Sequence, residues 1–342
     1  MSESTNSIEF NDIRRYVFSG SLTNAMSDYL VEFMKMGKFE PIDVLVSQLD
    51  RAGIKAMLKH AEKGIIKSMF IDSGAYSEHS QGIKIDVDEY ISYVNGLDDH
   101  ICAVAQVDHI PGVFKQAKKP EDYVESARLS WENFLYMYPK MKSPEKLVAV
   151  FHQGESFEHL KNMLEWKDPN GKPLQYIGIS PSNDRTVQDK DIYLRDVYSF
   201  IAKSNNPRVH THLFGYTSMP GLSKFPWFSC DSVSHRLRAA YNKMFVSYLK
   251  NSNGGDGDVI SFSKTRIAKD KASQCYLDIC DESSLKVFKE FLKGYGVDDP
   301  ERLCDDSSLR TAIDMCEVQK FVKSHPYVPQ AVWRPRQLFG KR

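Results

Sequence analysis

Residues 68–76 read Ser-Met-Phe-Ile-Asp-Ser-Gly-Ala-Tyr, a short apolar run that ends in an aspartate and a glycine. Such a run before a polar turn is typical of a buried β-strand. Similar runs recur along the chain, separated by longer amphipathic stretches. They predict eight strands: Tyr16–Ser19, Asp43–Ser47, Ser68–Ile71, Ala103–Val107, Leu147–Phe151, Tyr176–Ile179, Val209–Phe214 and Trp227–Cys230.

The amphipathic stretches predict helices, which alternate with the strands: Ala52–Lys63, Val87–Leu97, Glu121–Tyr138, Phe157–Trp166, Ile192–Ala202 and Ser232–Lys250. Strands that alternate with helices pair in parallel, and eight of them favour a closed (β/α)8 barrel, the TIM barrel. No Gly-x-Gly-x-x-Gly follows the first strand, which weakens the case for a doubly wound dinucleotide-binding sheet. We therefore predict an α/β TIM barrel with a short C-terminal helical extension.

The predicted boundary between the two parts lies in a stretch rich in Gly, Asn and Asp at residues 251–258. We assign residues 1–255 to the catalytic barrel. Residues 256–342 form the extension, which carries a basic segment, Lys264–Lys271, and predicted helices at Ser284–Tyr295 and Ser308–Lys323. We expect this extension to pack on the barrel.

The composition is typical of a globular protein without a membrane-spanning helix. The chain has 342 residues, is 42% hydrophobic, and balances 45 Lys and Arg against 45 Asp and Glu, as a globular protein does. No apolar stretch approaches the roughly 20 residues of a membrane helix, so we expect no membrane partner. Six cysteines without an export signal predict reduced thiols and a cytoplasmic protein. With no net charge, any contact with nucleic acid must come from local basic patches.

Polar residues follow the predicted strands, and a barrel places such residues around one mouth. They include Asp72, Asp108, Gln153, Gly154, Gly215 and Asp231. An aspartate after a strand can equally cap the next helix. Asp72 and Asp231, however, stand in apolar surroundings, where an unpaired charge is costly. Two such carboxylates suggest acid, base or nucleophilic chemistry at a sugar carbon.

The order of these motifs resembles the tRNA-guanine transglycosylase superfamily. The matching residues lie between about 69 and 236: Asp72-Ser73-Gly74-Ala75-Tyr76-Ser77, Asp108, Gln153-Gly154, Leu213-Phe214-Gly215 and Cys230-Asp231. The resemblance is greatest to the 7-deazaguanine DNA transglycosylases of phages and of some bacterial DNA-modification clusters. It implies an enzyme that exchanges guanine in DNA for a 7-deazaguanine such as 7-cyano-7-deazaguanine (preQ0), in the host cytoplasm if a phage encodes it.

The resemblance also implies roles for individual residues. Asp231 would be the nucleophile at C1′ of the target nucleotide, and Asp72 the general acid and base. The substrate-binding residues would be Ser73, Tyr76, Asp108, Gln153, Gly154 and Gly215, with Tyr76 stacking on the base and the others near its edge. A covalent ester to a carboxylate allows two displacements with net retention, so a base can be exchanged without ATP or a redox cofactor.

The sequence departs from the tRNA-acting enzymes in its C-terminal part. Those enzymes carry a zinc-binding Cys-x-Cys-x2-Cys motif and a distant histidine, whereas Cys275 and Cys280 here have four residues between them and Cys304 and Cys316 are isolated. We expect no metal and no cofactor, and we prefer DNA as the partner. Ala75 and Ser77 also replace the usual Gly and Gln.

The arginines after Asp231 and the histidines are the remaining candidates for binding nucleic acid or metal. Arg236 and Arg238 open the helix after Asp231, so we expect them to contact the nucleic-acid backbone. The histidines, among them His152, His210 and His212, show no His-Glu-x-x-His spacing and are interpreted as hydrogen-bonded pocket residues.

Three alternatives remain open. The same chemistry could act on tRNA, Asp72 and Asp231 could serve a glycoside hydrolase, or the chain could be a non-catalytic nucleic-acid-binding homologue. The sequence leaves open the oligomeric state, the inserted base and the target context.

Overall fold

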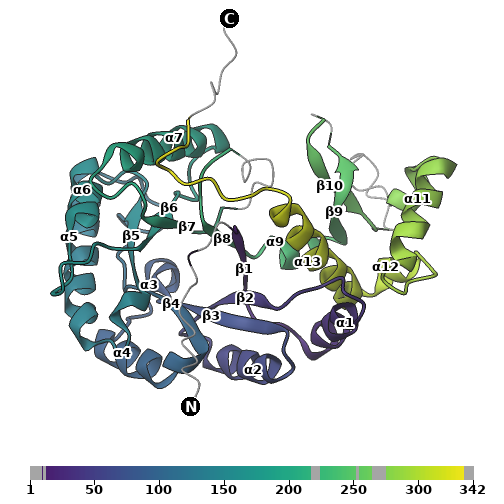
Figure 1. Cartoon of the computed structure of the whole chain (residues 1–342), viewed down its shortest axis with the longest axis horizontal. Helices are drawn as coiled ribbons and strands as arrows, with labels where there is room; N and C mark the ends of the chain where they lie inside the picture. Colours follow the sequence, from purple (N-terminus) through teal and green to yellow (C-terminus); the bar gives the residue numbers. More distant parts are fainter. Residues whose placement is uncertain (1–9, 11–12, 217–223, 252–253, 264–274, 335–342) are drawn as a thin grey trace, which may run out of the picture.

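The computed structural model describes residues 10, 13–216, 224–251, 254–263 and 275–334. Eight parallel strands close into one barrel, in which β8 pairs with β1 (Figure 1). The predicted TIM barrel is confirmed, and each predicted strand overlaps an observed one. The strands are β1 (Arg15–Ser19), β2 (Ile42–Ser47), β3 (Ile66–Asp72), β4 (Ile101–Ala105), β5 (Leu147–His152), β6 (Tyr176–Ser180), β7 (His210–Leu213) and β8 (Ser229–Ser232).

Helices cover the outside of the barrel (Figure 1). They are α1 (Asn24–Lys35), α2 (Arg51–Glu62), α4 (Val87–Gly96), α5 (Pro120–Met137), α6 (Phe157–Glu165) and α7 (Val187–Lys203). The short α3 (Ala75–Gln81) follows β3 and lies inside this ring of helices in Figure 1. Helix α7 begins with a capping box, in which Thr186 and Asp189 satisfy each other's backbone amides. The sequence prediction missed α1, although its buried Met26, Leu30 and Phe33 follow helical spacing.

The interior of the barrel is packed, and its N-terminal end is closed. Val17, Phe70, Val148 and Phe228 belong to one buried cluster inside the strands. Tyr327, which follows the last helix of the chain, packs its ring 5.6 Å from that of Phe228. Because the N-terminal ends are packed in this way, the C-terminal ends of the strands are the expected place for a functional site.

The segment after β8 differs from the prediction. We predict one helix over Ser232–Lys250, but only α9 (Ser234–Ala240) is helical. The rest forms β9 (Lys243–Lys250), which pairs antiparallel with β10 (Asp256–Ser261). This stretch is rich in residues that favour strands, and pairing with β10 overrides its helical spacing. The hairpin spans residue 255, where the sequence boundary between barrel and extension was placed.

The extension contains both predicted helices. They are α11 (Glu282–Lys293) and α13 (Ser307–Lys323), with the short α10 (Tyr276–Ile279) and α12 (Arg302–Asp305) before each. Helix α13 lies between the barrel and the β9–β10 hairpin (Figure 1) and packs against α1, α9 and β9. The basic segment Lys264–Lys271 lies outside the described residues. Within the described ranges, no helix is long and apolar enough to cross a membrane.

Arg238 joins the barrel to α13. Its guanidinium forms two hydrogen bonds of 2.6 Å with Asp314, and only 11% and 1% of the two side chains are exposed. Burial lowers the pKa of Arg238, but the charge of Asp314 and its hydrogen bonds raise it above the ordinary value. Arg238 is therefore occupied by a structural ion pair, which corrects our expectation that it contacts phosphate.

Arg238→Ala is expected to lower the free energy of unfolding by about 3–5 kcal/mol, because Asp314 would remain buried without its counter-charge. Denaturant unfolding measures this loss. Arg128→Ala is the control, since Arg128 also pairs with two carboxylates but is 50% exposed, so that its removal should change the free energy of unfolding far less. An equal loss in both variants would contradict the structural role of Arg238.

Candidate active site

The C-terminal ends of the strands bring both predicted catalytic carboxylates to one mouth. Asp72 ends β3 and Asp231 lies in β8, and all eight strands run parallel around the closed barrel. The negative charge of Asp231 contributes to the pKa of Asp72, so the two side chains interact electrostatically. Asp108, which follows β4, has a larger effect on the same pKa. Three aspartates from separate strands therefore share this mouth.

Asp231 is held by three hydrogen-bond partners. Ser19 Oγ donates to Oδ2 at 2.6 Å, the Gly215 amide donates to Oδ1 at 2.8 Å, and His212 Nε2 lies 3.3 Å from Oδ1. Burial raises the pKa of Asp231, but its interactions with His212, Ser19 and Gly215 outweigh burial and lower it below the ordinary value. Asp231 is thus ionised at neutral pH, as a nucleophile must be.

His212 orients Asp231 from inside the barrel. Its side chain is fully buried, and its Nδ1 lies 2.7 Å from Ser229 Oγ and 3.2 Å from Tyr176 OH. If these hydroxyls donate to Nδ1, Nε2 carries the hydrogen that faces Asp231. The sequence analysis interpreted His212 only as a hydrogen-bonded pocket residue and gave Ser19 no role, because the strand pattern does not show which side chains of neighbouring strands meet.

Asp72 has the opposite electrostatic environment. Burial, together with the negative charge of Asp108, raises the pKa of Asp72 to about 7, against a smaller opposing effect of the Gly74 amide. Gly74 has φ of 86°, and a Cβ there would lie 2.7 Å from the Leu49 side chain, so glycine is required beside Asp72. A carboxyl with a pKa near 7 can both donate and accept a proton at neutral pH.

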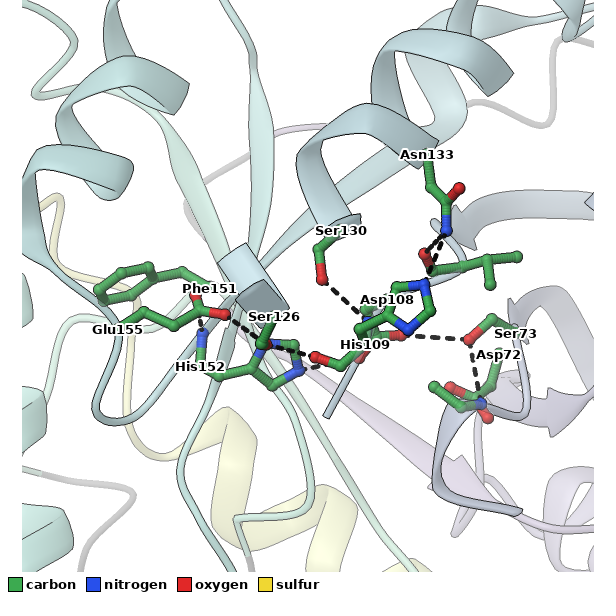
Figure 2. A network of polar contacts seen from close by, with 12 residues as sticks. Asp72, Ser73, Asp108, His109, Ser126, Ser130, Asn133, Phe151, His152 and Glu155 are labelled. Carbon is green, nitrogen blue, oxygen red and sulfur yellow. Dashed lines mark hydrogen bonds and ion pairs between the residues drawn. The ribbon is translucent and has the colours of Figure 1, made fainter. Parts of the chain in front are cut away.

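Asp108 belongs to a buried polar network (Figure 2). Its Oδ1 accepts a hydrogen bond from Ser73 Oγ at 3.2 Å, and its Oδ2 lies 2.8 Å from His152 Nε2. His152 Nδ1 in turn lies 3.1 Å from Glu155 Oε1. The predicted substrate-binding residues Asp108 and Ser73 are therefore in contact with each other, and His152 has the hydrogen-bonded pocket position that we expected.

A cavity of about 550 Å³ opens beside this network. Tyr76 is 54% exposed, and its ring meets Phe114 edge-on at 6.3 Å. Both rings line the cavity with His79, His152, Gln153 and Ser182. A cavity with an aromatic wall and a few polar groups is suited to a flat, polar ligand such as a nucleobase.

Gln153 and Gly215 have hydrogen-bond partners within the protein, whereas Gly154 is restricted by its backbone conformation. The Gln153 Oε1 accepts from the Ser182 amide at 3.0 Å, and the Gly215 amide is used by Asp231. Gly154 has φ of 107°, and a Cβ there would collide with the ring of Tyr123. Gln153 and Gly215 therefore hold other groups of the site in place, and the base-reading role that the resemblance implied for all three residues stays a prediction.

Of the two arginines that follow Asp231, Arg236 is the one that the fold leaves exposed near the mouth. Its side chain is exposed and crosses Gly20, directly after β1 and next to Ser19. No ion pair of Arg236 is found among the described residues, in contrast to Arg238.

The cysteines show no metal centre in the described part of the chain. Cys275, Cys304 and Cys316 are buried free thiols, and Cys280 is partly exposed. No group of three or more His, Cys, Asp or Glu side chains among the described residues is arranged to hold a metal ion.

Comparisons with known proteins add only distant similarities. No protein-family model matches the sequence, and no curated protein matches it. A proposed fructose-1,6-bisphosphate aldolase from Coccidioides immitis is 9% identical with a TM-score of 0.44, over 92% of this chain and 90% of the other. Gas2p of Saccharomyces cerevisiae, in complex with laminaritetraose and laminaripentaose, is 10% identical with a TM-score of 0.37, over 87% and 69%.

A fructose-bisphosphate aldolase from Campylobacter jejuni is 9% identical with a TM-score of 0.31, over 92% of this chain and 91% of that one. Similarities at this level carry no argument about activity, so the function must be inferred from the residues at the mouth.

Proposed function

We propose that this chain is a pentosyltransferase that exchanges guanine in DNA for a 7-deazaguanine base through a covalent intermediate on Asp231. The observation that supports this most is the contrast between two carboxylates at one mouth. Asp231 has a lowered pKa, whereas the pKa of Asp72 is raised to about 7. Two carboxyl groups whose pKa values are moved apart by their surroundings are suited to nucleophile and acid–base roles.

In the first step, a carboxylate oxygen of Asp231 attacks C1′ and the bond from C1′ to guanine N9 breaks. The bonding electrons leave with the guanine, and the protonated Asp72 supplies the proton that this base needs. The carboxylate form of Asp72 then removes the N9 proton of the incoming 7-deazaguanine. Its N9 attacks C1′ and displaces Asp231, so two inversions give net retention.

Asp108 is suited to recognise the base. An ionised carboxylate accepts hydrogen bonds from two adjacent N–H groups, and guanine and 7-deazaguanine both present N1–H beside a 2-amino group. Tyr76 offers an exposed ring at the wall of the cavity on which the base can stack. The guanine must leave the DNA helix to reach Asp231, which costs a few kcal/mol.

The preference for DNA over tRNA comes from the sequence, which lacks the zinc-binding motif of the tRNA-acting enzymes. Labelled guanine offered with duplex DNA, single-stranded DNA or tRNA tests both alternatives. Label in DNA alone would support the proposal. Label in tRNA alone would replace DNA by tRNA and leave the chemistry intact. No label in any nucleic acid under conditions where the protein is folded would refute the transglycosylase.

Arg236 gives a prediction about binding. Arg236→Ala is expected to raise the KM for DNA roughly threefold to tenfold, since its exposed guanidinium lies at the mouth. The slope of log KM against the logarithm of salt concentration should fall by about one, the value for one lost phosphate contact. Steady-state kinetics from 50 to 200 mM salt measure both effects. Arg208→Ala is the control, because Arg208 is exposed before the N-terminal end of β7. Equal effects of the two variants would contradict the prediction.

A further inference from the structure

His152 lies between two carboxylates that come from different parts of the chain. Its Nε2 is 2.8 Å from Asp108 Oδ2 and its Nδ1 is 3.1 Å from Glu155 Oε1. The three side chains are 6%, 12% and 0% exposed, so water does not replace these contacts. A ring with an ionised carboxylate at each nitrogen can satisfy both only if both nitrogens carry hydrogen, which is the imidazolium form.

Glu155 is fixed independently of His152's ring. Ser126 Oγ of α5 donates to its Oε1 at 2.9 Å, and the backbone amide of His152 donates to its Oε2 at 2.9 Å. The remaining titratable groups near His152 are His79 and His159, and both interact with it as like charges. Burial lowers the pKa of His152, but Glu155 and Asp108 together raise it to about 10.

The consequence for Asp108 is a fixed orientation. One of its oxygens accepts from His152 and the other accepts from Ser73 Oγ (Figure 2). Each carboxylate oxygen accepts more than one hydrogen bond, so both remain able to accept from a bound base.

We propose that His152, held by Glu155, is a positioning residue that orients Asp108 as a hydrogen-bond acceptor and thereby selects bases with an N1–H and a 2-amino group. This inference rests on the proposed function, because it assigns the base that Asp108 reads. It concerns the pair formed by His152 and Glu155, neither of which needs to touch the substrate.

His152→Gln is the direct test, since glutamine retains an N–H donor but removes the charge. Guanine and hypoxanthine, which lacks the 2-amino group, are compared as incoming bases between pH 6 and 9. We expect the KM for guanine to rise at least tenfold, because Asp108 loses the partner that orients it, while kcat stays within threefold. The preference for guanine over hypoxanthine should fall about tenfold at pH 6.5. Unchanged KM values and preference at every pH would overturn the inference.

Two measurements keep the test independent of catalysis and of folding. Nitrogen-15 NMR of the wild-type protein should show the His152 imidazolium through pH 9, and Glu155→Gln should bring its titration to lower pH. A wild-type His152 that titrates near pH 6.5 would overturn the inference without any variant. Calorimetry of guanine binding separates the two proposals: guanine bound by wild type and lost in His152→Gln at pH 6.5 supports this inference even if no nucleic acid is modified.

Discussion

Asp231→Asn should abolish base exchange, with kcat at least about 10⁴-fold below wild type. The amide of asparagine cannot form the glycosyl ester, so both displacements lose their nucleophile or leaving group. The substitution changes little else, because the asparagine oxygen can still accept from the Gly215 amide, and its NH2 group can donate to Ser19 Oγ, whose hydroxyl can rotate. Incorporation of labelled guanine measures the loss. A second readout is the covalent adduct between protein and DNA, which should form with wild type and be absent from the variant.

Asp98→Asn is the matched control for this experiment. Asp98 is also a buried aspartate, but it lies before the N-terminal end of β4, where it pairs with Lys146. We expect exchange by this variant to stay within a few-fold of wild type per folded molecule. Full exchange by Asp231→Asn would defeat the nucleophile assignment, and an adduct that persists in that variant would show that another side chain is the point of attachment.

The barrel could be predicted because its strands are short apolar runs with a polar residue at the end. Residues 68–72 give both the strand and the position of Asp72 at the mouth. The sequence could not reveal that β9 is a strand, because the hairpin depends on pairing with residues across a turn. Its Phe245 and Val259 face each other only in the folded chain. Local patterns favoured a helix there, and tertiary pairing decided otherwise.

The candidate site was predictable in its residue types and only partly in its contacts. The strand ends identify Asp72, Asp108 and Asp231, but a linear pattern cannot show that Ser19 from β1 donates to Asp231 of the paired strand β8. It also cannot separate Arg236 from Arg238. Both open α9, yet one is exposed beside Gly20 and the other is buried against Asp314. The ion pair of Arg238 with Asp314, which lies 76 positions further along the chain, causes this difference in exposure.

Asp72→Asn is expected to lower the rate of exchange about 10²- to 10⁴-fold, because asparagine can neither donate nor accept the transferred proton. In contrast to Asp231→Asn, this variant keeps its nucleophile, so the covalent adduct that it forms should accumulate rather than turn over. Quantifying adduct and product in one time course distinguishes the two roles. A rate of exchange by Asp72→Asn within threefold of wild type would contradict the acid–base role of Asp72.

The pH dependence of wild type provides a separate test of Asp72. Its pKa of about 7 means that the first step, which needs the protonated form, slows as pH rises above 7. The second step needs the carboxylate and slows as pH falls below 7. Exchange should therefore have its maximum near pH 7 and decline on both sides. A rate that is flat from pH 5.5 to 8.5 while chemistry limits turnover would contradict this role.

The raised pKa of Asp72 also predicts how the stability of the protein depends on pH, because ionising this buried group destabilises the folded state. Because the folded-state pKa of Asp72 lies above the ordinary value of 3.8, the folded protein favours the protonated form. The stability from this group is complete below pH 3.8 and is lost as pH rises toward 7, which costs up to about 4 kcal/mol above pH 7. Asp72→Asn, always neutral, should therefore unfold at higher denaturant concentration than wild type at pH 8, and the difference should shrink as the pH is lowered toward 4. A residue retained for its chemistry at the expense of stability gives this result, whereas a structural aspartate would give a variant that is less stable at pH 8.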